Sequence, residues 1–211
     1  MWSMPNIVYK GNYIKEVQNE SDQYDNISLY KDIEYFEEER PLVTFIKSCE
    51  KLVRNSKEYK VFEKWVTNTL GINFCQVNPD ITSEDATIEM HHGPLFTLYD
   101  YVSIVLSEYL KQNKKIDSYR IADTIIQEHF DLRVQVVMLT ITNHEGVHNK
   151  DIFLNVRQGI GDVSAFIEKY SKYLNDDYKY RIYRYIQLCK ESPSFDNGIL
   201  DIEKVSKLIE F

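Results

Sequence analysis

The chain is poor in cysteine, glycine and proline, and it contains no long uninterrupted apolar run. Its three cysteines, Cys49, Cys75 and Cys189, are far apart, which disfavours a disulfide framework or a cysteine-based zinc site and favours a reducing cytoplasm. No apolar run approaches the roughly 20 residues that span a bilayer. The first residues lack the basic and apolar regions of a signal peptide. We therefore expect a cytoplasmic protein with no membrane partner.

Scarce glycine and proline also favour helices joined by short connections. Only 7 glycines and 5 prolines occur in 211 residues, whereas tyrosine occurs 16 times. The apolar fraction of 43% and the charged fraction of 27% are typical of a folded globular protein. The length suits one sizeable domain. We expect an acidic N-terminal segment over 1–40 and a single helix-rich domain over 41–211.

The net charge of −8 disfavours long-range attraction to nucleic acid, since nucleic-acid binders usually carry a basic face. The charge is uneven, however. Residues 18–40 carry eight acids against two bases, and residues 146–190 carry eight bases against five acids. A DNA-facing surface would therefore lie on the C-terminal half. The acidic segment is expected to be a solvated face, or else a contact for a basic protein partner.

Hydrophobic periodicity predicts a helix-rich α+β fold. Helical spacing is found in seven stretches: 41–53, 58–70, 97–110, 118–130, 162–174, 176–190 and 201–209. Ser118 is a candidate N-cap. Alternating or β-branched residues predict strands over 86–92 and 132–141, and further candidate strands lie at 6–9 and 152–156. The second strand leads into a helix from about 143, so a small strand–strand–helix core should be embedded in a mainly helical scaffold.

Four of the five histidines form two pairs, His91-His92 at the end of the first strand and His144 with His148 in the following helix. Histidines four apart lie on one face of a helix, so both can reach one ion. Neighbours in a strand point to opposite faces, so only one of His91 and His92 faces that ion. A divalent ion on His91, His144 and His148 would keep positions open for phosphate and water, with His92 as general base.

The segments Glu89-Met90-His91-His92-Gly93-Pro94 and Val136 to His148 resemble the HNH, or ββα-metal, endonucleases, most closely the colicin-type DNase branch. The resemblance covers about a tenth of the chain and implies a core at 86–156. It makes His91, His144 and His148 ligands of one divalent metal ion (Mg, Mn, Ni or Zn), and His92 the general base. The asparagine that usually orients the base is replaced by Gln135, with Asn143 as a further candidate for that role.

The resemblance implies a metal-dependent endonuclease that hydrolyses phosphodiester bonds in DNA, of a kind found in phage-encoded proteins and then acting in the host cytoplasm. Two alternatives stay open. One is a structural zinc site, although such sites usually include cysteines and a fourth protein ligand. The other is a degenerate, non-catalytic phage-type accessory or protein-binding protein. The connection between the two strands is longer than in most of the family, since it holds the helices predicted between 97 and 130.

Three other features have both a functional and a structural interpretation. The interleaved aromatic and basic residues of 178–185 could stack on bases and meet phosphates, but at helical spacing Tyr178, Ile182 and Tyr185 form a packing face. The loop 159–162 could bind phosphate through its amides, yet a turn that starts a helix explains it equally well. His129 is interpreted as a helix-end residue, where a cation suits the helix dipole.

Overall fold

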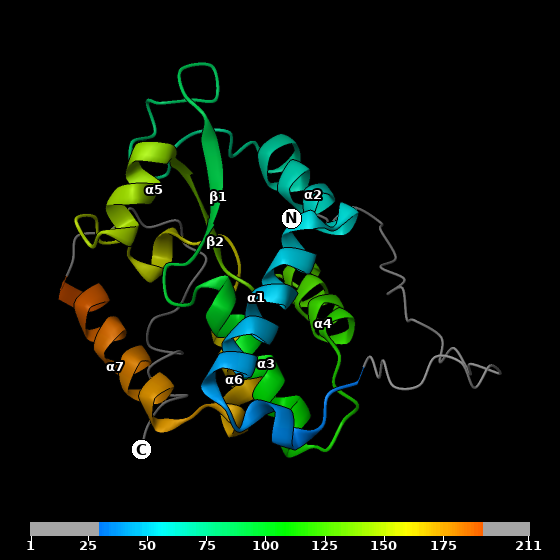
Figure 1. Cartoon of the computed structure of the whole chain (residues 1–211). Helices are drawn as coiled ribbons and strands as arrows, with labels where there is room; N and C mark the ends of the chain where they lie inside the picture. Colours follow the sequence, from blue (N-terminus) through cyan, green and yellow to red (C-terminus); the bar gives the residue numbers. More distant parts are fainter. Residues whose placement is uncertain (1–29, 192–211) are drawn as a thin grey trace.

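Seven α-helices and a two-stranded sheet dominate the part of the chain that the structure, a computed structural model, describes, residues 30–191 (Figure 1). The helices and strands are α1 (Glu39–Asn55), α2 (Lys57–Lys64), β1 (Ile88–His92), α3 (Leu98–Lys111), α4 (Ser118–Phe130), β2 (Val136–Thr140), α5 (Ile141–His148), α6 (Val163–Tyr170) and α7 (Asp176–Glu191). The predicted helix-rich α+β class is confirmed. No helix within 30–191 has the length and apolar character needed to cross a membrane.

Side-chain caps fix where several helices begin. The Ser56 hydroxyl accepts the Tyr59 N–H at the start of α2. Thr97 and Asp100 form a reciprocal capping box at the start of α3. Asp117, not the predicted Ser118, caps α4, because its carboxylate accepts two first-turn N–H groups. Each cap satisfies donors that a helix end otherwise leaves without partners.

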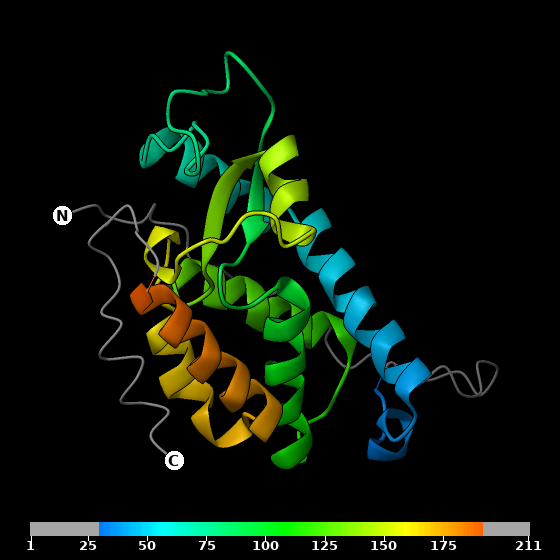
Figure 2. The same cartoon turned by 90° about the vertical axis from the view of Figure 1, so that its left-hand side faces the viewer.

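The main apolar core lies between α1, α3, α4 and α6, with α7 packed on the outside (Figures 1 and 2). Phe166 of α6 meets Tyr101 of α3 edge to face, with ring centroids 4.7 Å apart. Ile182 of α7 is fully buried, and Tyr178 and Tyr185 pack against the same core. The packing face predicted for α7 is therefore confirmed.

The two strands are antiparallel, and their two faces have different neighbours. His91 lies opposite Val137 and His92 opposite Val136. Val137 belongs to a small apolar cluster that α5 covers through Val147, whereas Val136 belongs to the main core. Because side chains alternate along a strand, His91 faces α5 and His92 faces the helical body.

Several predicted boundaries change. The strands are shorter than the predicted 86–92 and 132–141, and α5 begins at Ile141 instead of about 143. The helix predicted over 58–70 stops as an α-helix at Lys64 and continues as a π-helical turn, Trp65–Thr69. The candidate strand 152–156 does not form, because Asn155 caps the 3₁₀ turn Val156–Gln158 and bends the backbone away. The predictions for 6–9 and 201–209 lie outside the described residues.

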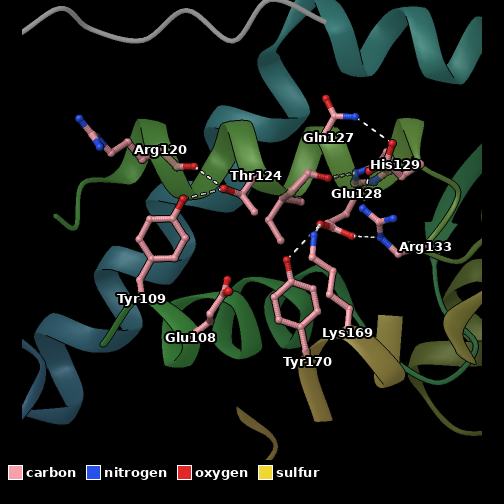
Figure 3. Close-up of polar contacts among 12 residues, drawn as sticks. Glu108, Tyr109, Arg120, Thr124, Gln127, Glu128, His129, Arg133, Lys169 and Tyr170 are labelled. Atoms are coloured by element: carbon pink, nitrogen blue, oxygen red, sulfur yellow. Dashed lines mark hydrogen bonds and ion pairs between the residues drawn. The ribbon is translucent and has the colours of Figure 1, made fainter. Parts of the chain in front are cut away.

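A buried carboxylate, that of Glu128 on α4, links α4 to α6 (Figure 3). Glu128 is 1% exposed. It pairs with Arg133 and Lys169 and accepts a 3.0 Å hydrogen bond from the Tyr170 hydroxyl. Burial alone would raise the pKa of Glu128, but the hydrogen bonds from Arg133 and Lys169 outweigh it and lower that pKa. Such a buried charge is tolerated only because it is paired.

Candidate metal centre

Three imidazoles from two elements converge beside the sheet. His91 lies in β1, and His144 and His148 lie one turn apart in α5. One ring nitrogen of each lies within 4.8 Å of the others, and the Nε2 atoms of His144 and His148 are 3.0 Å apart. Two imidazoles on a tetrahedral ion with bonds of about 2.0–2.1 Å have nitrogens about 3.3 Å apart. The spacing of His144 and His148 is close to this value, whereas the 4.8 Å span of the whole set is larger, so the three nitrogens would have to move closer together to bind one divalent ion.

The three histidines come together because α5 follows β2 with no intervening loop. Thr140 is the last residue of β2 and also the N-cap of α5, and its hydroxyl accepts the Asn143 N–H. Gly146 lies against Ile152 so closely that an added Cβ would stand 2.8 Å from the Ile152 Cδ1 atom. Gly146 therefore allows α5 to pack closely on the residues that follow it, and the contacts of His144 with Glu89 and of both helix histidines with the His91 ring direct them toward β1.

Glu89 orients one of the three imidazoles. It lies two residues before His91 and so on the same face of β1, and its Oε2 atom is 2.9 Å from the His144 Nδ1 atom. Because a carboxylate accepts, Nδ1 carries the proton and the Nε2 lone pair of His144 faces the centre. A carboxylate that accepts from the outer nitrogen of a ligating histidine is a common arrangement in metal sites. This role of Glu89 was not predicted from the sequence, although its two-residue spacing from His91 indicates a shared strand face.

The three imidazoles differ in exposure. His91 is buried at 7% exposure, His144 is half-buried and His148 is exposed. The pKa of His91 is lowered to about 4, first by burial and then by the charges of His144, His148 and Arg54. A low pKa keeps His91 in the neutral form that a metal ion requires.

His92 lies on the other side of β1, with 3% of its surface exposed. Its Nε2 atom is 3.0 Å from the Nε2 atom of His129, and its ring stacks on that of Tyr59 at 5.7 Å. The His129 Nδ1 atom in turn lies 2.7 Å from the carbonyl oxygen of Ile125. Burial is the first cause that lowers the pKa of both histidines, that of His129 to about 4 and that of His92 well below its usual value. Both rings are therefore neutral near pH 7.

This chain of contacts fixes the tautomer of both rings. The Ile125 carbonyl can only accept, so His129 carries its proton on Nδ1 and accepts at Nε2. His92 then donates from Nε2, and its Nδ1 atom keeps a lone pair. That Nδ1 atom is buried and has no hydrogen-bond partner in the described residues. The interpretation of His129 as a cationic helix-end residue is corrected, since it is neutral and 1% exposed.

Neither amide proposed to orient His92 has a hydrogen bond to it in the described part of the chain. Gln135 is fully buried, and its Nε2–H donates to the Val156 carbonyl at 2.8 Å. Asn143 donates to the Cys75 sulfur at 3.0 Å. The contact to His92 comes from His129, which lies 37 residues away on α4. No local spacing in the sequence indicates that partner.

The three-histidine centre opens into a cavity of about 130 Å³. His92 lines the same cavity, and so do Glu50 and Arg54 of α1. The cavity therefore joins the candidate ion ligands, the candidate base and one positive side chain.

The other candidate phosphate sites are occupied by internal contacts. The Asp162 carboxylate accepts the Ser164 and Ala165 N–H groups at the start of α6, so the loop 159–162 is a helix-start turn. Gly161 has φ +112°, and a Cβ there would stand 2.5 Å from the Val134 carbonyl oxygen. On α7, Arg181 is exposed and pairs with Asp100 at 2.9 Å.

Comparison with known proteins identifies one family. The model of the bacteriophage G278-like virion protein family matches residues 6–210. Searches of curated proteins and of solved structures return no match.

Proposed function

We propose that this chain, which belongs to the bacteriophage G278-like virion protein family, is a metal-dependent endonuclease that hydrolyses phosphodiester bonds in DNA. The observation that supports the proposal is the convergence of His91, His144 and His148 within 4.8 Å. Three protein ligands leave coordination positions for water and for a phosphate oxygen, as in catalytic metal sites.

The ion supplies a positive charge that polarises the phosphate and stabilises the leaving oxygen. The chain supplies the position of each donor. Glu89 holds the His144 ring by its Nδ1–H, and burial keeps His91 neutral. In hydrolysis the water oxygen bonds to phosphorus, the bond from phosphorus to the 3′ oxygen breaks, and the water proton passes to a base. The leaving 3′ oxygen takes a proton from solvent water, so the products are a 3′-hydroxyl and a 5′-phosphate.

His92 is the proposed acceptor of that proton. It lines the cavity beside the three ligands, and its Nδ1 lone pair has no other partner in the described residues. Its donor nitrogen is committed to His129, so Nδ1 is the basic atom. A neutral imidazole is the form that a general base requires.

The test is metal binding and plasmid nicking by the full chain with Mg, Mn, Ni or Zn. Substitution of His91, His144 or His148 by alanine is expected to reduce both metal affinity and nicking. His92→Ala is expected to abolish nicking and leave metal affinity within about twofold, because His92 is not a ligand. Metal affinity lost with His92→Ala but retained with His91→Ala would refute these roles.

A second candidate function is a non-catalytic accessory protein of the phage particle. It is favoured by the burial of His92, 3% exposed and hydrogen-bonded to His129, and by the net charge of −8. This candidate predicts a bound metal ion without cleavage of plasmid, single-stranded DNA or RNA. Metal-dependent nicking that requires His92 would exclude it.

A further inference from the structure

We propose that Arg54 forms a phosphate-binding subsite next to the three-histidine centre. The inference rests on the proposed function, since the phosphate is taken to be that of the nucleic acid backbone. It adds a residue from α1, an element outside the strand–strand–helix unit that carries the histidines. The ligand class is a phosphodiester or phosphate group whose non-bridging oxygens lie between the ion ligands and the guanidinium.

The packing of α1 directs Arg54 toward the centre. Cys49 and Val53 are fully buried on the inner face of α1, which fixes the rotation of the helix about its axis. Arg54 is in the last turn of α1 and is exposed. Together with His91, His144 and His148 it borders the cavity of about 130 Å³.

Arg54 has no carboxylate ion pair among the described residues. Arg120, Arg133 and Arg181 each pair with a carboxylate. Arg40, Arg157 and Arg184 resemble Arg54 in this respect, but of these four arginines Arg54 is the one that lines the cavity beside the three histidines. A guanidinium presents two parallel N–H groups that match two oxygens of a phosphate.

Arg54 places a positive charge beside the centre, because it lines the same cavity as the three histidines. Glu50, one turn earlier, brings an acidic group to the same cavity. An anion in this cavity would therefore be attracted by Arg54 and opposed by Glu50, so the two residues should have opposite effects on phosphate affinity.

The experiment uses the full chain, with zinc alone and then inorganic phosphate as probes, and measures both affinities by calorimetry. A hydrogen bond to a charged group contributes enough that its loss should weaken phosphate binding about 10- to 100-fold. We expect that loss in Arg54→Gln, with zinc affinity within about twofold of the unsubstituted chain. Arg54→Lys should be intermediate, because lysine keeps the charge without the planar fork. Glu50→Gln should bind phosphate more tightly.

Arg40→Gln is the matched control, because Arg40 is an exposed arginine near the opposite end of α1, about 20 Å away at 1.5 Å per residue. It should leave phosphate affinity unchanged. The proposal is overturned if Arg54→Gln binds phosphate as well as the unsubstituted chain, or if Arg40→Gln weakens binding equally. If phosphate binding depends on Arg54 but the chain shows no metal-dependent nicking, the nuclease function is refuted and the phosphate-binding subsite is still supported. If zinc does not bind, the phosphate affinities of the metal-free unsubstituted chain, Arg54→Gln and Arg40→Gln are compared in the same way, and an affinity that Arg54→Gln does not lower overturns the proposal.

Discussion

Removal of the Glu89 carboxylate tests whether the three histidines are built to hold an ion. Glu89→Ala takes away the acceptor that holds the His144 Nδ1–H, at 2.9 Å in the native chain. The ring could then rotate or carry its proton on the nitrogen that faces the ion. Metal affinity should fall although no ligand has been removed.

The size of the effect follows from the exposure of the pair. Loss of an outer partner of a ligating histidine typically costs 10- to 100-fold in metal affinity. The side chains of Glu89 and His144 are 43% and 26% exposed, so water can replace part of the lost contact. We therefore expect the lower end of that range, about 10-fold or about 1.4 kcal/mol.

Zinc and nickel affinities by calorimetry measure the effect. Glu89→Gln keeps a neutral acceptor and should lose less than Glu89→Ala. Glu145→Ala is the control, because Glu145 is exposed, adjoins His144 and carries the same charge. An equal loss of metal affinity in Glu145→Ala would show that the loss in Glu89→Ala comes from the removal of a nearby negative charge, not from the hydrogen bond to His144. No loss in Glu89→Ala, together with a large loss in His144→Ala, would refute the orienting role.

Three further predictions concern stability. The pKa of His129 is lowered to about 4 in the folded chain from an ordinary value of 6.5, so the unfolded chain binds more protons between these values. Neutral His129 therefore costs no stability above pH 6.5, and the free energy of unfolding falls by roughly 3 kcal/mol as the pH is lowered from 6.5 toward 4. Urea titrations at several pH values should show that the free energy of unfolding depends less steeply on pH in His129→Gln than in the native chain. Glu128→Ala should lower the free energy of unfolding by about 1–3 kcal/mol, since it leaves the buried Tyr170 hydroxyl without its acceptor; an unchanged free energy of unfolding in a denaturant titration would contradict this. Gly161→Ala should destabilise by at least about 1–2 kcal/mol, because it adds a Cβ at φ +112° where L residues are strained, and a melting temperature equal to that of the native chain would show the prediction to be wrong.

Local pattern was enough to predict most of the elements. Apolar residues at helical spacing located α1, α3, α4, α6 and α7, and the strand signals located β1 and β2 to within a few residues. These signals are local because helix and strand periods are properties of neighbouring residues. The failures have local causes as well, such as the Asn155 cap that replaced a predicted strand with a turn.

Sequence spacing also predicted which histidines meet. Side chains four apart share a helix face and neighbours in a strand do not, so His144 and His148 were placed together and His91 was separated from His92. The role of each as ligand or base stays a prediction. So do the boundary at residue 40 and the DNA partner.

What only the tertiary structure decided is which residues from distant elements complete the centre. His129 reaches His92 from α4, and Arg54 reaches the cavity from α1. Both contacts depend on how helices pack across the core, which no periodicity within one segment encodes. The sequence therefore determined which three histidines converge and their division between two elements. The packing of α1 and α4 against β1 determined the partner of His92 and the charge beside the centre.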